Sequence, residues 1–178
     1  MTPAELKALI RTVPDFPRPG IQFRDITTLL ADGRGLAAAV EQIARQAKAD
    51  GGTAIAGIEA RGFIFGAAVA SLLKLGFVPV RKPGKLPVPT IGVDYSLEYG
   101  VSRLELDPTL IAPGQRVVIV DDLIATGGTT LAAAQLLREA GAVVDRALFV
   151  IELPELGGAQ LLRDNGIQIE ALIAFEGD

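Results

Sequence analysis

Short apolar runs alternate with amphipathic stretches along most of the chain. The apolar runs cover residues 53–58, 77–80, 116–120, 143–152 and 167–175. Helical spacing of apolar positions occurs over residues 2–13, 32–48, 63–75, 128–140 and 156–165. Short strands without polar alternation are typical of a parallel sheet that is covered on both faces. The pattern therefore predicts an α/β fold, doubly wound, with a mostly parallel sheet and helices on both faces.

The N-terminal segment shows strong local signals for a helix and a stiff connector. Thr2 and Glu5 have the spacing of a capping box, and a proline stands at the first helical position. We therefore predict a helix over residues 2–13 that Pro14 ends. Three prolines between residues 14 and 20 indicate a stiff connection, and a short extended piece follows.

Residues 81–107 depart from the alternating pattern. This stretch holds three prolines, three glycines, two tyrosines and many charges. Long segments of this kind in compact domains are often lids over a binding site. Residues 95–99 and 103–106 have the character of strands, so we expect a hairpin that folds over a ligand. The length of 178 residues fits a single domain, 1–178.

Composition narrows the possible chemistry. The chain has no cysteine and no histidine, which excludes disulfides, thiolate metal sites, a cysteine nucleophile and a histidine base. A formal net charge of −4 disfavours broad binding to nucleic acid or to anionic membranes. The N-terminus lacks a signal-peptide pattern, and no apolar run approaches the length of a spanning helix. We expect a soluble, cytoplasmic protein with neither nucleic acid nor membrane as a partner.

The strongest chemical signal is the string from Val117 to Thr130. Two carboxylates, Asp121 and Asp122, follow a buried apolar run, and a turn of small residues leads into a helix. Backbone N–H groups of such a turn can bind phosphate, and the turn lacks the lysine of a nucleoside-triphosphate loop. Adjacent carboxylates beside a phosphate fit sugar hydroxyls or a metal; the alternative is an acidic turn without function. The turn consists of Ala125, Thr126, Gly127, Gly128 and Thr129.

This string resembles the signature of the type I phosphoribosyltransferases that binds phosphoribosyl pyrophosphate (PRPP). The resemblance implies that Asp121 and Asp122 hold the ribose 2′- and 3′-hydroxyls and that residues 125–129 hold the 5′-phosphate. The signature is specific for PRPP or a nucleoside monophosphate. It does not identify the base.

Three further segments resemble the adenine-using branch of that family: residues 16–26, residues 59–63, and residues 81–87 with their continuation to 95–100. The match weakens after residue 150. It implies transfer of the phosphoribosyl group to adenine, giving AMP and pyrophosphate in purine salvage. It also implies a homodimer, a hood segment over residues 1–30 and a lid loop over residues 81–107.

The resemblance assigns a second group of residues to pyrophosphate. Arg61 presents a planar fork of donors that suits pyrophosphate. The alternative is a surface arginine that caps a turn and binds no ligand. The basic residues of the lid could close over the same anion or be ordinary solvated charges. The implied pyrophosphate-binding residues are Glu59, Ala60, Arg61, Arg81, Lys82, Lys85 and Tyr99.

Adenine and the catalytic groups take the remaining assignments. Phe23 and Leu123 are candidates to sandwich the purine, and Phe23 could instead be a core residue. By resemblance Glu98 is the acid–base group, and Arg61 and Lys85 complete the catalytic set. Mg²⁺ is the expected cofactor, held mainly by PRPP oxygens and water without a direct protein ligand. The expected adenine-binding residues are Gln22, Phe23, Arg24 and Leu123.

Alternatives stay open at this stage. The chain could use another base, or it could be a PRPP-sensing regulator on the same fold. The C-terminal strand offers Gln168 and Glu170 but no basic side chain, which disfavours a 6-oxopurine or orotate. A nucleotide-binding module without chemistry would leave Arg61, Lys85 and Glu98 unexplained.

Overall fold

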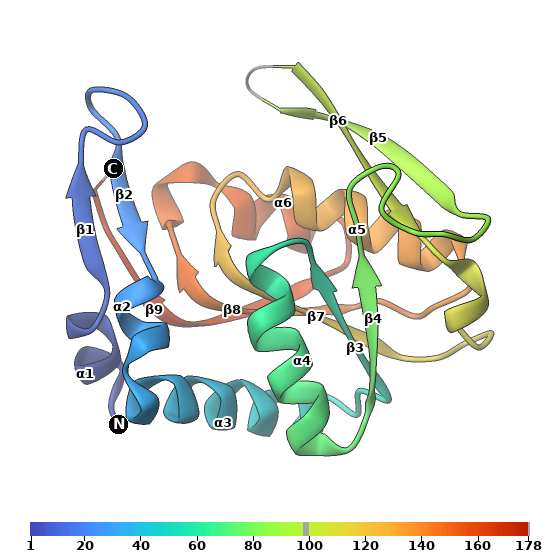
Figure 1. Ribbon diagram of the computed structural model, residues 1–178, viewed down its shortest axis with the longest axis horizontal. Helices are drawn as coiled ribbons and strands as arrows, with labels where there is room; N and C mark the ends of the chain where they lie inside the picture. Colours follow the sequence, from blue (N-terminus) through green and yellow to red (C-terminus); the bar gives the residue numbers. More distant parts are fainter. Residues whose placement is uncertain (98–99, 178) are drawn as a thin grey trace.

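A five-stranded parallel sheet forms the centre of the protein, with strand order β4-β3-β7-β8-β9. The computed structural model describes residues 1–97 and 100–177. The predicted doubly wound α/β architecture is confirmed (Figure 1). The strands of this sheet are β3 (Ala54–Ile58), β4 (Gly76–Val80), β7 (Val117–Ile124), β8 (Arg146–Glu152) and β9 (Gln168–Ala174).

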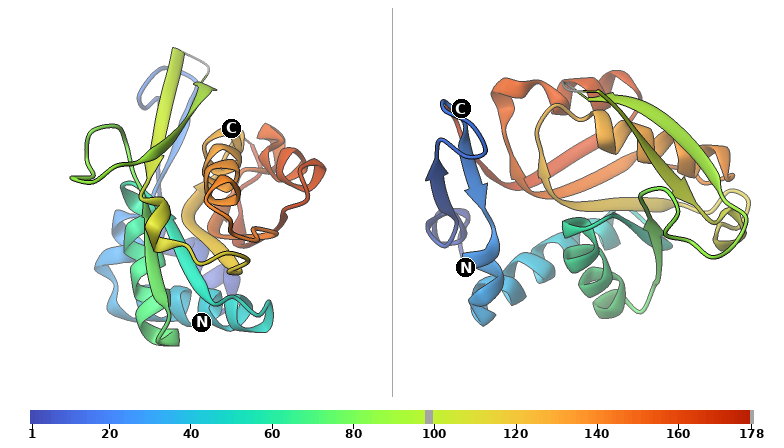
Figure 2. Two further views of the ribbon diagram at one scale, coloured as in Figure 1. Left: turned by 90° about the vertical axis from the view of Figure 1, so that its right-hand side faces the viewer. Right: turned by 45° about the horizontal axis from the view of Figure 1, so that its top comes forward.

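Helices cover both faces of the sheet, as Figure 2 shows. One face carries α1 (Pro3–Ala8), α2 (Thr27–Ala31), α3 (Gly33–Ala49) and α4 (Arg61–Leu73). The other face carries α5 (Gly128–Glu139) and α6 (Gly158–Asp164). Within the described residues, no helix combines the length and the hydropathy that crossing a bilayer requires.

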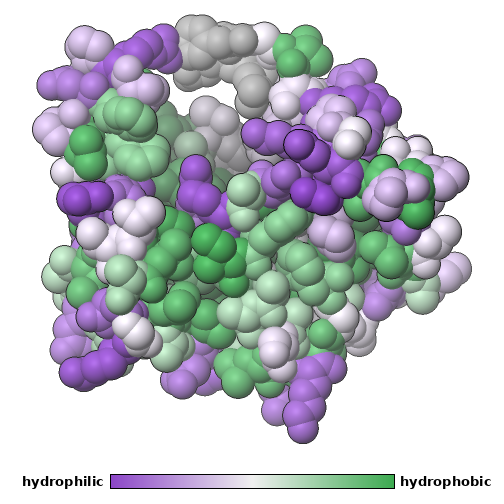
Figure 3. Space-filling view, viewed as in Figure 1, coloured by the Kyte–Doolittle hydropathy of each residue, from purple (hydrophilic) through white to green (hydrophobic). Residues whose placement is uncertain are grey.

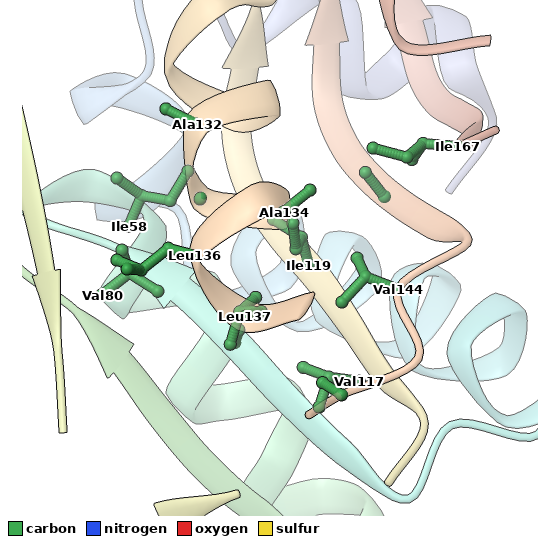
Figure 4. Packing of buried hydrophobic residues seen from close by; sticks show 14 of the residues in the cluster. Ile58, Val80, Val117, Ile119, Ala132, Ala134, Leu136, Leu137, Val144 and Ile167 are labelled. Atoms are coloured by element: carbon green, nitrogen blue, oxygen red, sulfur yellow. The ribbon is translucent and has the colours of Figure 1, made fainter. Parts of the chain in front are cut away.

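Alternate residues of β7 divide between the two cores, because successive side chains of a strand point to opposite faces. Val117 and Ile119 pack with α5, whereas Val118 and Val120 pack with α3 and α4. Figure 4 shows Leu136 and Leu137 of α5 packed over the sheet. Both faces of the strand are therefore apolar, which explains why its sequence shows no polar alternation.

The strand order places a binding crevice between β3 and β7. From β3 the chain passes outward to β4 and then returns to β7 on the other side of β3. Ligands of open parallel sheets bind outside the carboxyl ends of the strands where the order reverses. The segments that follow Ile58 and Ile124 meet at this point.

The N-terminal segment corrects one prediction. The capping box of Thr2 and Glu5 is present, but α1 ends at Ala8 and residues 11–13 are not helical. Instead β1 (Arg11–Pro14) pairs with β2 (Gln22–Asp25) in an antiparallel hairpin, with Val13 opposite Phe23. Pairing with a distant segment therefore outweighs the local helical spacing in residues 11–13. The short helix α2 was not predicted from the sequence.

Two boundaries on the sheet also differ from the prediction. The strand predicted over 116–120 continues to Ile124, so Asp121 and Asp122 lie within β7. Pairing with β8 maintains this extension after the ladder with β3 has ended. Strand β8 begins at Arg146 rather than at Val143. Two short 3-10 turns, Pro108–Leu110 and Pro154–Leu156, complete the elements.

The predicted hairpin over the site is present as β5 (Ile91–Leu97) and β6 (Gly100–Leu106). Its root is part of the core, because Leu104 and Leu106 are buried against α5. Arg81 and Glu105 form a bridge that ties the start of the preceding loop to β6. The hairpin rises above the sheet from this anchored base (Figure 1).

The hood segment is attached to the C-terminal end of the chain. Lys7 donates a hydrogen bond from Nζ to the carbonyl of Ala174 at 2.6 Å, and Arg24 donates from Nη2 to the carbonyl of Gly177 at 2.7 Å. Both cations also lie 4.6 Å from the ring centroid of Phe175. Figure 2 shows the C-terminus beside the β1–β2 hairpin. The two ends of the chain thus fix the hood at one end of the sheet.

Asp25 provides a test of how the hood is stabilised. Hydrogen bonds from the hydroxyl and N–H of Thr27, followed by the Arg11 guanidinium, lower the pKa of Asp25 from 3.8 to about 2. A carboxyl with a lowered pKa in the folded state stabilises above its unfolded pKa, and the effect is lost as pH falls through the folded pKa. We expect the stability advantage of wild type over Asp25→Asn to be full above about pH 5 and to shrink between about pH 4 and pH 2. Urea unfolding of both proteins across this range measures it, and an advantage that is independent of pH would contradict the assignment.

Candidate active site

A cavity of about 330 Å³ lies at the carboxyl ends of β3 and β7. Figure 3 shows hydrophilic side chains gathered over the upper part of the molecule, around the hood and the hairpin segment. Because its lining residues follow β3 and β7, the cavity occupies the crevice that the strand order predicts. It is lined by Ile58, Glu59, Ala60, Arg61, Lys82, Asp121, Asp122, Leu123, Ile124, Ala125, Thr126, Gly127, Thr129 and Thr130.

The turn between β7 and α5 presents a run of free backbone donors. Among the described residues, no hydrogen bond engages the N–H groups of residues 125–130, and the first bond of α5 runs from Leu131 to Gly127. Gly127 has a φ of +80°, a conformation that glycine adopts without the strain of a side chain. Free N–H groups at the start of a helix attract anions through both hydrogen bonds and the helix dipole. The geometry fits a phosphate group.

Asp121 and Asp122 occupy the floor of the cavity. Asp122 is only 4% exposed and accepts a hydrogen bond from Arg61 Nε at 2.5 Å. The Asp122 N–H donates to Oδ1 of Asp121 at 2.8 Å. Burial, and then the charge of Asp122, raise the pKa of Asp121 well above its ordinary value of 3.8. The two carboxyls therefore differ: Asp122 is hydrogen-bonded to a cationic partner, whereas Asp121 accepts a backbone N–H from Asp122 and lies beside the negative charge of that residue.

Helix α4 approaches these carboxyls closely because its second residue is a glycine. A Cβ atom on Gly62 would lie 2.8 Å from Asp121 Oδ1 and 3.2 Å from the Val120 carbonyl oxygen. Real Cβ atoms essentially never show contacts under 3.0 Å, so a side chain here would displace either the Asp121 carboxyl or α4. Gly62 thus places Arg61, at the first position of α4, within reach of Asp122.

Arg61 belongs to two cavities. It lines the cavity at the carboxyl ends of β3 and β7, here called the phosphate cavity. It also lines a second cavity of about 390 Å³ under the hood, here called the hood cavity. Partial burial opposes its charge, but the carboxylate of Asp122 outweighs this effect and raises the pKa of Arg61. Its side chain is still 57% exposed, and its terminal nitrogens have no hydrogen-bond partner among the described residues. The guanidinium is fixed at one edge and free at the other.

The carboxylate of Glu59 is engaged by the root of the loop that precedes the hairpin. It accepts hydrogen bonds from the Lys82 N–H at 2.9 Å and from Arg81 Nη2 at 3.2 Å. These two interactions, the Lys82 bond first, lower the pKa of Glu59. The Glu59–Ala60 peptide bond is cis. The carboxylate thus anchors Lys82 at the rim of the cavity.

Two basic residues predicted to bind pyrophosphate do not line this cavity in the described part of the chain. Arg81 pairs with Glu59, and its Nη1 donates to the carbonyl of Lys85 at 3.1 Å. Lys85 is exposed on the loop before β5. Closure of that loop would be needed to bring either cation to the cavity.

The second cavity is largely apolar and lies under the hood. Phe16 and Phe23 meet edge to face there, with ring centroids 5.1 Å apart. Arg24 donates from Nη1 to the hydroxyl of Thr12 at 2.8 Å, which holds its side chain along the hood. A flat apolar ring with a polar edge suits this space. The cavity is lined by Val13, Phe16, Phe23, Arg24, Asp25, Ile26, Thr27 and Arg61.

The predicted site residues thus divide among three locations. The phosphate cavity brings together most of the PRPP and pyrophosphate set, with Leu123, while Gly128 opens α5 at its edge. Phe23 and Arg24 lie in the hood cavity, and Gln22 is paired with Pro14 in the hood hairpin. The predicted acid–base residue Glu98 and the neighbouring Tyr99 fall outside the described residues.

Sequence reasoning assigned no role to several lining residues. Phe16 stood within a segment used for the resemblance, beside a proline, and nothing local marked it as part of a cavity. Thr27 is the first residue of α2, the short helix that the sequence did not predict. Thr130 stood only as the last residue of the Val117–Thr130 string, and it is buried at the cavity wall.

Comparison with known proteins agrees with this geometry. The family described as phosphoribosyl transferase domain matches residues 26–157. An adenine phosphoribosyltransferase of Erythrobacter litoralis is 71% identical over 99% of each chain, and one of Novosphingobium aromaticivorans is 68% identical over the same shares.

Solved structures agree at the level of the whole chain. The adenine phosphoribosyltransferase of Thermoanaerobacter pseudethanolicus has a TM-score of 0.93 at 48% identity and covers 98% of this chain and 100% of its own. The enzyme of Giardia lamblia, in complex with 9-deazaadenine, has a TM-score of 0.91 at 34% identity and covers 98% of each chain. The chain therefore belongs to the adenine phosphoribosyltransferases, within the phosphoribosyl transferase domain family.

Proposed function

We propose that the protein joins adenine to PRPP, giving AMP and pyrophosphate, and so serves purine salvage. The observation that carries this proposal is the juxtaposition of two cavities at Arg61: a polar one with a free N–H turn and paired carboxylates, and an apolar one under the hood. The first suits the phosphoribosyl group, and the second suits the base. Each reactant therefore has a cavity of matching chemistry, and the two cavities share one residue.

In the proposed reaction N9 of adenine attacks C1′ of the ribose as the bond from C1′ to the pyrophosphate oxygen breaks. Positive charge develops on the sugar ring, and negative charge develops on the leaving group. Catalysis comes mainly from positioning and electrostatic stabilisation, which suits a chain without cysteine or histidine. The 5′-phosphate lies on the turn over residues 125–129, and Asp121 and Asp122 accept hydrogen bonds from the ribose hydroxyls.

Arg61 and the loop cations act on the leaving group in this proposal. Asp122 fixes Arg61 through Nε, so the free terminal nitrogens can donate to pyrophosphate without further ordering of the side chain. Lys82, anchored by Glu59 through its backbone, adds a second cation at the cavity. Arg81 and Lys85 would join on closure of the loop, and Ala60 contributes backbone.

Adenine lies where the two cavities adjoin, with Phe23 of the hood cavity against one face and Leu123 of the phosphate cavity against the other. The hood strand with Gln22 and Arg24 reads the edge of the base. Glu98 takes the proton that N9 loses, and Tyr99 orders the closed hairpin. We propose these two roles from the family resemblance. Closure over the site would exclude water and suppress hydrolysis of PRPP.

Magnesium fits the proposed site as a cation that arrives with PRPP. Among the described residues, no three acidic side chains cluster in a way that could hold a metal ion. Mg²⁺ commonly keeps water and substrate phosphates as its ligands, so few protein ligands are needed. When bound, it supplies Lewis-acid stabilisation of the pyrophosphate. Asp121 and Asp122 would contact it through water or through the ribose oxygens that they hold.

We further propose that residues 1–178 act as one domain, with a hood over 1–30 and a lid over 81–107. A homodimer remains a prediction from the family resemblance, and a cytoplasmic location remains a prediction from the sequence pattern of the N-terminus and the apolar runs. Exposed Ile64 and Leu72 on α4 offer apolar surface of the kind that subunit contacts use.

A single assay tests the proposed function. We expect the purified protein with PRPP and Mg²⁺ to form nucleotide from adenine and to form little from hypoxanthine, guanine, xanthine or orotate. Addition of EDTA is expected to stop the reaction, since the charge on pyrophosphate is then uncompensated. Chromatography of the products measures both effects. Product from another base would overturn the assignment of the hood, and PRPP binding without product from any base would favour a regulator.

The same assay separates chemistry from binding at the lid. The matched variant is Glu98→Gln, which keeps the shape of the side chain and removes its basicity. A lower kcat with little change in the KM for PRPP supports the acid–base role, and an unchanged kcat excludes it.

A further inference from the structure

The connection between β8 and α6 lies directly against the phosphate turn. The Leu153 N–H donates to the Ile124 carbonyl at 3.0 Å, and the Gly158 N–H donates to the Ala125 carbonyl at 3.0 Å. Two consecutive carbonyls, one at the end of β7 and one at the start of the turn, are therefore tied to a segment about thirty residues further along the chain. Residue 158 lies just past residues 26–157, the stretch matched by the phosphoribosyl transferase domain.

These two hydrogen bonds determine where the next N–H groups point. In a trans peptide unit the C=O and the following N–H lie on opposite sides, and the cis peptide bonds found in the described part of the chain, Phe16–Pro17 and Glu59–Ala60, are elsewhere. With the Ile124 and Ala125 carbonyls bound to the connection, the N–H groups of Ala125 and Thr126 point away from it. Both residues line the phosphate cavity, and neither N–H has a partner among the described residues.

Gly158 is buried and has no room for a side chain. A Cβ atom there would lie 2.2 Å from the Ala125 carbonyl oxygen, 2.7 Å from the Gly127 nitrogen and 2.8 Å from the Thr126 carbonyl carbon. All three are backbone atoms of the turn, so no flexible side chain can give way. The contact is mutual, because a Cβ on Gly127 would lie 2.8 Å from the Gly158 carbonyl oxygen.

We propose that Gly158 is a positioning residue for the phosphoribosyl transfer: its bare backbone holds the turn over residues 125–127 in the shape that binds the 5′-phosphate. The inference rests on the proposed function, since it assigns the 5′-phosphate to this turn. A side chain at residue 158 would push the turn toward the cavity and rotate the Ala125–Thr126 peptide unit. The effect should be confined to the 5′-phosphate, because Arg61 and Lys82 belong to other segments.

The test compares Gly158→Ala with Gly33→Ala as a matched control. Gly33 is also the first residue of a helix, and a Cβ there would meet nothing within 4 Å. Ribose 5-phosphate and pyrophosphate are used separately as competitors of PRPP. Because relief of the overpacked contact distorts the turn, we expect the inhibition constant of ribose 5-phosphate to rise roughly 5- to 150-fold in Gly158→Ala. The constant of pyrophosphate should stay near that of wild type, and Gly33→Ala should change neither.

The outcomes separate this inference from the proposed function. Equal weakening of both competitors in Gly158→Ala, or of neither, overturns the positioning role. Failure of ribose 5-phosphate to bind the wild-type protein overturns the assignment of the turn itself. If Gly158→Ala does not fold, hydrogen exchange of the wild type decides: ribose 5-phosphate should slow exchange of the Gly158 amide, which bonds to Ala125, and should leave the start of α3 unchanged. Unchanged exchange at Gly158 overturns the inference.

Discussion

Replacement of Asp122 by asparagine is expected to lower kcat/KM for PRPP by roughly 10²- to 10³-fold, because each hydrogen bond to a charged group contributes about 1.5–3 kcal/mol and the change affects both the ribose contact and the bond to Arg61. Asp122 is almost fully buried and is bonded to Arg61 at 2.5 Å. Asparagine keeps the shape of the side chain but loses the charge that orients Arg61. It also offers one oxygen instead of two to the ribose hydroxyls. Both effects fall on the phosphoribosyl half of the site.

The binding of products localises this loss. AMP carries the ribose hydroxyls and pyrophosphate does not, so Asp122→Asn should weaken AMP more than pyrophosphate. Calorimetric titration of each product measures the difference. Because Arg61 remains more than half exposed, water can solvate it, and we expect a Tm shift of only about 2–4 °C, as for about 1 kcal/mol in a chain of this size.

A matched control lies at the opposite end of the same sheet. Asp145 pairs with Arg116 through a short charged hydrogen bond, where β7 and β8 begin, and both side chains are near half exposed. Exposed pairs contribute about 0–1 kcal/mol, so Asp145→Asn should leave kcat/KM nearly unchanged. If Asp122→Asn also keeps the activity of wild type, Asp122 does not contact the sugar and the assignment of the signature is wrong.

The parts of the site that could be predicted from the sequence are those whose signals are local. The apolar run before Asp121 and the small residues after Ile124 lie side by side in the chain, so their juxtaposition follows from a strand, a turn and a helix in series. The cavity also needs Arg61 from a different strand end. That pairing follows from the rule for parallel sheets, since carboxyl ends meet at one edge.

Other features depend on contacts between distant segments and left no local signal. Residues 11–14 form a strand because residues 22–25 pair with them, and the register is decided by that partner. Gly158 follows another glycine and reads as a flexible entry to a helix. The requirement for glycine at this position is seen only in the structure, where the backbone of residues 125–127 packs against it. Steric limits between backbones have no periodicity, so sequence patterns do not reveal them.

Arg61→Lys is expected to weaken the binding of pyrophosphate more than the binding of AMP, which is the reverse of the result expected for Asp122→Asn. Lysine keeps the positive charge but replaces a planar fork by a single ammonium, and it loses the bond that Nε makes to Asp122. We expect kcat/KM for PRPP to fall about 100-fold, since hydrogen bonds to charged groups contribute about 1.5–3 kcal/mol. Pyrophosphate affinity should fall with it, and AMP affinity should change by less than about fivefold, because AMP lacks the leaving group.

The two variants can therefore be compared with each other: Asp122→Asn should lower the affinity for AMP most, and Arg61→Lys should lower the affinity for pyrophosphate most. Titration of both products into both proteins measures both effects, with Arg116→Lys as the control for a loss of the guanidinium far from the site. A double variant should lose less than the sum of the two single losses, because the Arg61–Asp122 bond is broken already in each. If Arg61→Lys weakens AMP as much as pyrophosphate, Arg61 acts only by orienting Asp122, and the contact with the leaving group must come from Lys82 and the loop that carries it.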